Sequence, residues 1–589
     1  MYEPEKLKTD VLIVGGGISG SMAAIQAREH GADVLVLELA NTYRSGSAGS
    51  GIDHLYSYVP PVHEKVGYTK DHMKEDMADQ NYIRAGLGDR EISDHFVDTS
   101  YERIIGLEKY GLKFRFEDSH LAEGFRLVPQ FHSIPTSLNF EGRDLKVKLT
   151  NAMIQAGVRI VNHAQVVEIL KNKNGDAIGA VALSTRAEKL FVAEAKAVVI
   201  ATSNSAVRLS PPINQNDEHF ENPSSSGSGY GITLPLDAGA EMANLEFMLK
   251  EGILAFFGFS TRVGSPGSSW WPAARVVDDD GNIIVRRIID YDINEPEYLE
   301  KNIRQYAEFM DEFYSMSRYL AEGRQLYMDF EDATDAETEY IKWSLSHEGR
   351  HWLFIRNLER EHVDFKKVKI PYKYEKRTLM RDGICTGAFV NWKCETTVNG
   401  LYAAGDAMGA SSESGSVAVV FGYEAGLQAA EYAKKAPAGS DSDIDNEQIQ
   451  KIQTRIEQLR SNEGGEFWRN VEKALRGIVV AFGNLPLTDT KIENALYLVK
   501  KLKQNPNLSA KDTHEMARSF QVLSLIESAE AIFMAAKNRD SSFGPYKRVK
   551  RYADIKDHDG GGAPTQTVVY TLYKDKNGEY QYRTRNLLK

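Results

Sequence analysis

Three glycines near the start of the chain have the spacing of a turn that binds phosphates. Residues 10–38 read DVLIVGGGISGSMAAIQAREHGADVLVLE, with the glycines between an apolar strand and an expected helix. In this spacing Gly15 makes the tight turn, Gly17 lets a pyrophosphate approach the backbone, and Gly20 lets helix and strand pack closely. The first turn of the helix, which includes Ser19, offers unpaired N–H groups to the phosphates. The pattern predicts a dinucleotide site.

An acid closes the second apolar run of this segment. Glu38 follows the run 34–37, where a carboxylate can accept hydrogen bonds from the hydroxyls of a ribose. The alternative is an ordinary glycine-rich loop, but strand, glycines, helix, strand and acid all occur here in register. The position near the start of a long chain favours FAD over NAD, by analogy with known folds.

A loop of small residues follows the acid. Residues 42–54 read TYRSGSAGSGIDH, and the backbone at Ser45, Gly46 and Gly51 can approach a flat ring. We expect this loop to lie along a flavin; the alternative is a flexible surface turn. His54 ends the loop and could shuttle protons near neutral pH, although a lone histidine is more often hydrogen-bonded structure.

A late stretch, residues 397–430, also ends a short apolar run in an acid. It reads TVNGLYAAGDAMGASSESGSVAVVFGYEAGLQAA, and Asp406 is placed to hydrogen-bond a ribityl chain. The helix expected from about Ser416 is rich in small residues, so its first N–H groups can face the pyrimidine end of a flavin. A further buried strand, AVVIAT at 197–202, returns the chain to the nucleotide sheet and brings Ala201 to it.

Composition limits the classes of protein that this chain can belong to. Its 589 residues predict two to four domains. A net charge of -12 gives no reason to expect nucleic acid binding. No apolar run approaches the length of a membrane span, and the residues before the first strand do not resemble a signal peptide. A cytoplasmic location is expected.

The cysteine content bears on metal and redox chemistry. Cys385 and Cys394 are the only two cysteines, whereas an iron–sulfur cluster with all-cysteine ligation needs four. We therefore expect no such cluster and no metal site in this chain. The spacing is not that of a CxxC redox pair, and we interpret both residues as structural thiols.

The apolar patterns predict an α/β architecture: a Rossmann-like FAD-binding domain with an inserted α+β capping domain. A C-terminal helical domain and a terminal strand pair are implied by the family resemblance described next. The expected segments are the first part of the FAD-binding domain (1–245), the capping domain (246–370), the second part of the FAD-binding domain (371–440), the helical domain (441–555) and a strand pair (556–589). Asn577 and Gly578 are the hairpin turn signal of that last segment.

These motifs together resemble the FAD domain of the succinate dehydrogenase and fumarate reductase flavoprotein superfamily. The resemblance rests on the GxGxxG opening, the AVVIAT strand and the GLYAAGD strand before a small-residue helix, and it covers nearly the whole chain. The branch of the adenylylsulfate reductase alpha subunit is most similar, through the RSG loop (44–46), SGSGY (226–230), GRQLYM (323–328) and Ser-Gly-Ser (414–416). The histidine that binds FAD covalently in many relatives is replaced at 43–46, so the resemblance implies non-covalent FAD.

The chain departs from these relatives around the substrate. LMRDG at 379–383 and SSWWP at 268–272 lie where fumarate reductases carry their HxxxGG-like and RGEGG-like segments. No histidine near Arg381 and no clear arginine near Lys250 matches adenylylsulfate reductase. A small anionic substrate would need cations, and the candidates are Arg143, Lys250 and Arg381. The alternative for each is a solvated or structural cation.

These features predict an FAD-dependent oxidoreductase subunit of the adenylylsulfate reductase type. The alternatives are an enoate reductase resembling fumarate reductase and an electron-relay flavoprotein subunit. Because the chain has no second nucleotide motif for NAD and too few cysteines for a cluster, electrons must come from another protein. The resemblance implies a ferredoxin-like 4Fe–4S subunit, for which an apolar stripe (449–459) and a basic run (547–551) form a candidate docking surface; the alternatives are internal packing and solvation.

Overall fold

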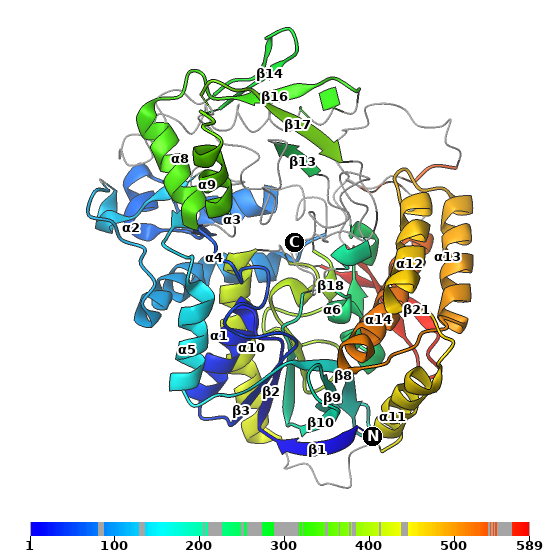
Figure 1. Cartoon of the computed structure of the whole chain (residues 1–589). Coiled ribbons are helices and arrows are strands. Elements are labelled where there is room, and N and C mark those ends of the chain that lie inside the picture. Colours follow the sequence, from blue (N-terminus) through cyan, green and yellow to red (C-terminus); the bar gives the residue numbers. More distant parts are fainter. Residues whose placement is uncertain are drawn as a thin grey trace.

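The chain forms layered sheets and helices that are described here from a computed structural model (Figure 1). The described residues are 2–79, 87–119, 121–128, 136–203, 206–209, 227–248, 252–255, 274–287, 316, 319–320, 322–347, 351–364, 366–375, 379, 385–411, 414–436, 446–539, 542, 546, 548–550 and 568–587.

A five-stranded parallel sheet carries the glycine turn. Its order is β19-β11-β2-β3-β7, and each neighbouring pair is parallel. The strands are β2 (Val11–Val14), β3 (Val34–Glu38), β7 (Arg159–Asn162), β11 (Ala197–Ile200) and β19 (Leu401–Ala403). The apolar runs are continuous because such a sheet is covered on both faces. The predicted Rossmann-like sheet is confirmed, and the carboxyl ends of its strands meet at one edge.

Two helices from opposite halves of the chain pack tightly beside this sheet. α1 (Ile18–Glu29) and α10 (Gly415–Lys435) lie side by side (Figure 1). Glycines in α10 permit the contact, since a Cβ on Gly422 would lie 2.5 Å from the carbonyl oxygen of Ser19. A Cβ on Gly426 would lie 2.3 Å from that of Ala23. The backbones of the two helices are therefore in direct contact.

The other elements build around this core. The four-stranded sheet β1-β10-β9-β8 consists of β1 (Glu3–Lys8), β8 (Ala164–Lys171), β9 (Ala177–Ser184) and β10 (Lys189–Glu194). A small sheet near the site contains β4 (His54–Tyr56), β5 (Leu127–Val128) and β6 (Ser137–Asn139). The helices of this half are α2 (Pro60–His63), α3 (Lys70–Asp79), α4 (Arg90–Ile105), α5 (Leu145–Gln155) and α6 (Tyr230–Ala238).

An antiparallel sheet occupies the region where the capping domain is predicted. Its order is β13-β17-β16-β14-β15, with β13 (Gly252–Ala255), β14 (Arg275–Asp278), β15 (Ile283–Val285), β16 (Leu326–Asp329) and β17 (Ile370–Glu375). Two helices, α8 (Asp335–His347) and α9 (His351–Arg360), lie between this sheet and the rest of the molecule in Figure 1. The domain boundaries themselves stay a prediction.

The C-terminal part combines helices with a hairpin. The helices are α11 (Asn446–Ser461), α12 (Trp468–Phe482), α13 (Asp489–Gln504) and α14 (Thr513–Asn538). β20 (Val568–Lys574) and β21 (Tyr580–Asn586) form the hairpin, in which Gly578 has φ +78°. They join the sheet β18-β12-β20-β21 through β12 (Met242–Ala243) and β18 (Gly387–Ala388).

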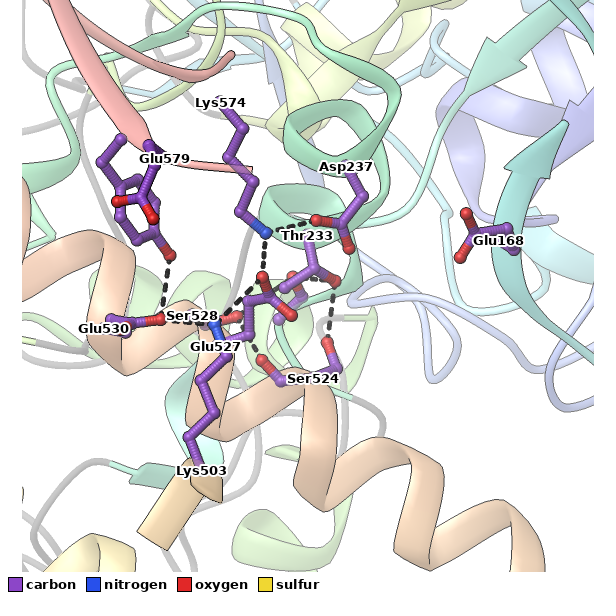
Figure 2. A network of polar contacts seen from close by, with 12 residues as sticks. Glu168, Thr233, Asp237, Lys503, Ser524, Glu527, Ser528, Glu530, Lys574 and Glu579 are labelled. Carbon is purple, nitrogen blue, oxygen red and sulfur yellow. Dashed lines mark hydrogen bonds and ion pairs between the residues drawn. The ribbon is translucent and has the colours of Figure 1, made fainter. Parts of the chain in front are cut away.

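A network of charges, most of them half-buried, ties this hairpin to α6 and α14 (Figure 2). Lys574 Nζ lies 2.5 Å from Asp237 Oδ1 and also pairs with Glu527. On the other side Lys503 Nζ lies 2.5 Å from Glu530 Oε2, which also accepts a hydrogen bond from a tyrosine of β21. Burial raises the pKa of Asp237, and the neighbouring Glu527 adds to that shift. Each lysine of the network pairs with carboxylates, and these pairs offset the cost of removing the charges from water.

The composition of α14 resembles that of a membrane span. Its best window has a mean hydropathy of 1.3, and 78% of that window is buried inside the protein. Within the described part of the chain it is the one helix that passes such a test. The core helix of a globular protein passes it too, so this is weak evidence for a membrane segment.

The prediction that the apolar stripe at 449–459 forms part of a docking surface is wrong. Ile452, Ile456 and Leu459 of α11 are buried, and Ile449 packs partly buried against the main core. The helical period is as the sequence predicts, but the stripe packs internally. In the basic run, the Arg548 guanidinium is largely buried and pairs with an aspartate of α13. Lys547 and Arg551 lie outside the described residues.

The contact between α1 and α10 leads to a prediction on stability. Gly426→Ala should lower the melting temperature, because the new methyl group would force apart two backbones and cost about 1–3 kcal/mol. Gly477→Ala in α12 is the matched control, since no atom lies within 4 Å of its Cβ position. It should raise the melting temperature through a gain of about 0.5–1 kcal/mol in helix propensity. Equal shifts of the two variants in calorimetry would contradict the close contact.

Candidate active site

The glycine turn has the steric form that the sequence predicts. Gly15 has φ +99°, and a Cβ there would lie 2.9 Å from the carbonyl oxygen of Ala201 at the end of β11. A Cβ on Gly20 would lie only 1.8 Å from the carbonyl oxygen of Gly15. Gly17 is the N-cap of α1 and provides no side-chain cap, so no N-cap side chain satisfies the first N–H groups of the helix.

The small-residue loop lies directly on this turn. Gly46 has φ +81°, and a Cβ there would lie 3.1 Å from Gly17 Cα. Ser45 Oγ donates a hydrogen bond of 3.1 Å to the carbonyl oxygen of Gly16. The loop is thus packed against the start of α1, and it is not a free surface turn.

Glu38 is buried and braces the turn from the end of β3. Its Oε2 accepts a hydrogen bond of 2.5 Å from the backbone N–H of Gly16, and its Oε1 accepts one of 2.7 Å from that of Ala40. These bonds were not predicted, since the sequence indicated only a ribose contact. The carboxylate therefore orders the backbone of the turn in addition to any contact with a nucleotide.

Three hydroxyl groups around the same edge of the sheet are buried without a hydrogen-bond partner. They are Ser19 Oγ in α1, Thr42 Oγ1 in the small-residue loop and Thr202 Oγ1 after β11. Buried hydroxyls nearly always have partners, because an unsatisfied one costs about 1–3 kcal/mol. A polar ligand at this edge would supply them, and the uncapped helix start favours an anionic one.

The late stretch of the sequence converges on the same place. Gly405 has φ +63°, and a Cβ there would lie 2.9 Å from Ser19 Cβ, so the short helix η7 (Gly405–Ala407) with Asp406 lies against the start of α1. Ser414 caps α10 by accepting a hydrogen bond of 3.1 Å from Val417 N–H. Ser416 Oγ accepts one of 2.7 Å from the backbone N–H of Tyr56, which joins α10 to β4.

Gly51 is the point where three distant segments meet. It has φ +105°, and a Cβ there would lie 2.6 Å from Arg143 Cα and 3.0 Å from the carbonyl oxygen of His347. Nearby, His54 Nδ1 lies 2.5 Å from Oδ1 of the buried Asp53. Two of the four candidate catalytic residues, His54 and Arg143, therefore lie around one loop. The other two, Lys250 and Arg381, lie outside the described residues.

His347 was not predicted from the sequence. It is the last residue of α8, and its Nδ1 is buried with no hydrogen-bond partner among the residues that the structure describes. Burial lowers the pKa of the imidazole and Arg143 contributes, while Glu141 and Asp53 act in the opposite direction. A neutral imidazole next to a loop of this kind can accept a proton at neutral pH. No local pattern marks this histidine, because only tertiary packing brings α8 to Gly51.

Aromatic contacts dock α8 beside this loop. The guanidinium Cζ of Arg126 lies 4.8 Å from the ring centroid of Trp343 and 4.4 Å from that of Phe116. The Phe116 and Trp343 rings meet edge to face at 5.3 Å, and the Trp343 ring also contacts His347 at 5.0 Å. One stacked group thus fixes the end of α8 that carries the histidine.

The described residues show no grouping of three or more histidine, cysteine or acidic side chains that could hold a metal ion. Cys385 and Cys394 are both buried. Burial raises the pKa of the Cys394 thiol well above its usual value, and a nearby Glu424 adds to this. Such a thiol is unreactive, as expected for a structural cysteine.

Comparisons with known proteins agree with this geometry. A family model described as "FAD binding domain" matches residues 10–416. A protein of Methanocaldococcus jannaschii described as an uncharacterized FAD-dependent oxidoreductase is 21% identical over 566 residues, which cover 92% of this chain and 93% of that protein.

Solved structures with the same fold include adenylylsulfate reductase from Archaeoglobus fulgidus, with a TM-score of 0.79 and 18% identity over 100% of this chain and 97% of that one. E. coli quinol fumarate reductase matches with a TM-score of 0.74 and 18% identity, over 99% of this chain and 97% of that one. At this identity the likeness shows the fold alone. It confirms the predicted fold class, and the family model confirms the FAD binding domain.

The docking of α8 can be tested by amide hydrogen exchange. Trp343→Leu should speed exchange over residues 335–347 on the order of tenfold, because it removes a cation–π contact that contributes about 0.5–2 kcal/mol. Trp343→Phe, which keeps a ring beside Arg126, should change it less. If the leucine variant exchanges like the native protein, other contacts hold α8 in place.

Proposed function

We propose, since the chain belongs to the FAD binding domain family and is an FAD-dependent oxidoreductase, that it is a flavoprotein subunit of the adenylylsulfate reductase and fumarate reductase type. It acts on a small anionic substrate, with electrons from an iron–sulfur partner. The observation that carries the proposal is the convergence at Gly51 of a cation, Arg143, and an unpaired imidazole, His347, beside the flavin loop.

The residues at the edge of the sheet fit FAD. We propose that the turn of Gly15, Gly17 and Gly20, together with Ser19, holds the pyrophosphate, because uncapped N–H groups and an unpaired hydroxyl lie there. Glu38 is placed to hold the ribose that follows β3. The remaining assignments are Ser45, Gly46 and Gly51 along the ring, Ala201 under the turn, Asp406 at the ribityl chain and Ser416 at the start of α10.

The flavin is proposed to be non-covalent. The segment 43–46 carries no histidine, and its arginine, Arg44, bonds within the loop to the carbonyl oxygen of Gly49 at 3.4 Å. When bound, FAD supplies a centre that accepts or delivers hydride. The protein then has to bind the substrate, orient it and move a proton.

This chain's own side chains suit those tasks. Arg143 follows Gly142 at the start of α5 and can hold an anionic group near the loop, since guanidinium groups match oxyanions well. His347 Nδ1 has no hydrogen-bond partner among the described residues, so it can accept a hydrogen bond from the substrate or relay a proton to it. The Asp53–His54 pair, at 2.5 Å, can exchange a proton with it or hold one ready. Lys250 and Arg381 remain candidates from the sequence.

An external electron donor is the second part of the proposal. It is supported by the presence of only two cysteines in the sequence, both buried, and by the lack of a second nucleotide motif. A ferredoxin-like 4Fe–4S subunit fits these facts. The docking surface for this subunit is not assigned, because the apolar stripe on α11 is buried. The cytoplasmic location also stays a prediction from composition.

An enoate reductase is the second candidate function. It is favoured by partial similarity to one subunit of the fumarate reductase (CoM/CoB) of Methanothermobacter marburgensis, 23% identical over 258 residues, or 41% of this chain and 42% of that protein. The third alternative is a relay subunit that reduces no small substrate of its own.

Substrate-dependent oxidation of a reduced viologen dye separates these functions. Adenylyl sulfate should oxidise the dye, and sulfite should bleach the flavin absorbance. His347→Gln should lower kcat at least tenfold while FAD stays bound, since it removes a group that can relay a proton to the substrate and keeps a polar side chain. Oxidation by fumarate or another enoate instead would select the second function, and no oxidation by either would select the relay.

Glu38→Ala tests the cofactor assignment. It should weaken FAD binding at least about tenfold, because two bonds from backbone N–H groups to a charged carboxylate are lost together with the ribose acceptor. Flavin is measured in the supernatant after acid precipitation, which releases non-covalent FAD. Glu29→Ala, at the exposed end of α1, is the control and should bind FAD normally. Unchanged affinity of the Glu38 variant would mean that the ribose lies elsewhere.

A further inference from the structure

Lys146 is a fully buried amine beneath the glycine turn. It comes from α5 and is 1% exposed. Its Nζ donates hydrogen bonds to the carbonyl oxygens of Gly16 and Gly17, the latter at 3.3 Å, and to Ser21 Oγ at 2.8 Å. All of its acceptors belong to the turn or to the first turns of α1. No sequence motif marks this lysine, because the apolar pattern around it is that of an ordinary amphipathic helix.

The acceptors of Lys146 are neutral. Among the ion pairs of the described residues, none includes this lysine, and Glu38 is the carboxylate whose charge acts on it from the other side of the turn. Burial lowers the pKa of the ammonium group to about 7, and Glu38 only partly offsets that effect. A buried cation of this kind is costly unless a counter-charge is supplied. Something other than protein is therefore expected to balance it.

The hydrogen bonds of Lys146 also set the direction of two peptide groups. In a planar trans peptide the C=O and the following N–H point in opposite directions. Because the carbonyl groups of Gly16 and Gly17 point toward Lys146, the N–H groups of Gly17 and Ile18 point away from it. Those two N–H groups form the start of α1, and the start of a helix favours an anionic ligand.

We propose that Lys146 is a positioning residue of the dinucleotide site: it holds the two peptide groups with their N–H bonds toward the pyrophosphate and supplies the buried positive charge that balances it, so that binding of FAD is coupled to uptake of a proton. The inference rests on the assignment of the turn to FAD and is independent of the substrate and of the electron partner.

The coupling has a definite sign. The bound pyrophosphate is an anion, so it favours the ammonium form and raises the pKa of Lys146 above its value of about 7 in the protein without FAD. Below pH 7 the lysine is protonated in both states, and affinity does not change with its titration. Above pH 7 binding takes up a proton, and affinity falls by at most about tenfold per pH unit until the raised pKa is reached.

Few other groups near Lys146 can contribute to this dependence. From β3 the facing group is Glu38, from α1 it is Ser21, and from the small-residue loop it is Ser45, which bonds to the same carbonyl oxygen of Gly16. Of these three groups, all of them described residues, Glu38 is the one that carries a charge. The serine hydroxyls do not titrate between pH 6 and pH 9.

The test titrates the full-length protein, freed of flavin, with FAD at pH 6, 7, 8 and 8.5, following flavin fluorescence. Calorimetry at pH 8 in buffers of different ionisation enthalpy counts the protons taken up. The native protein should bind FAD more weakly as pH rises above 7 and should take up at most one proton. Lys146→Met should bind at least tenfold more weakly at pH 6, with no pH slope and no proton uptake.

Two further variants complete the design. Lys148→Met is the matched control on the same helix, since Lys148 pairs with Asp144 at 3.0 Å toward solvent, and it should behave like the native protein. Lys146→Arg keeps its charge throughout this pH range and should bind FAD without the pH slope. If the methionine variant does not fold, Lys146→Arg still tests whether the pH dependence of FAD binding comes from Lys146.

The outcomes separate this inference from the cofactor assignment. A native pH slope in either Lys146 variant, or native affinity at pH 6 in Lys146→Met, overturns the role of Lys146. Binding of FAD by the native protein without proton uptake at pH 8 also overturns it, while leaving the cofactor in place. If the native protein binds no FAD at all, the cofactor assignment fails as well.

Discussion

The structure depends on a contact in which backbones touch with no side chains between them. At the carboxyl edge of the parallel sheet, Gly15 lies against Ala201, and Gly405 lies against the first turn of α1. Behind them Gly426 brings α10 onto α1. A methyl group at any of these glycines would meet backbone or a helix side chain. This close approach leaves the first N–H groups of α1 without a side-chain cap, and Ser19, Ser45 and Glu38 lie in or against the turn that leads into them.

The sequence was informative where function depends on local geometry. The roles of Gly15 and Gly20 follow from spacing alone, since a tight turn between a strand and a helix admits few residue types. The same holds for the parallel pairing of β2 and β3, because strand, helix and strand in succession favour a parallel pair. His347 and Lys146 could not be found in this way. Each is ordinary within its own helix, and its importance comes from the distant loop on which that helix packs.

Prediction from the sequence was also limited by patterns that are compatible with two different structures. The period of α11 predicts an apolar face equally well for a docking surface and for internal packing, and the second proved right for Ile452 and Ile456. The partners of a charged side chain in the structure distinguish better between a structural role and a role in ligand binding. Lys574 is matched by Asp237 and Glu527, and Arg539 by Glu246, so these pairs stabilise the joins between segments. Lys146 has only neutral acceptors, which is what a group awaiting an anionic ligand would show.

The order of strands in the nucleotide sheet also constrains how the protein is made. β2, β3 and β11 are synthesised within the first 200 residues, but β19 and α10 follow only at 401–435. Because β19 joins at the edge of the sheet beside β11, a nascent chain can assemble the other four strands and add the last one without opening them. Until then β11 is an unprotected edge strand on the ribosome. The proposed cofactor site is therefore complete only after α10 has been synthesised, although four of the five strands of its sheet precede residue 201.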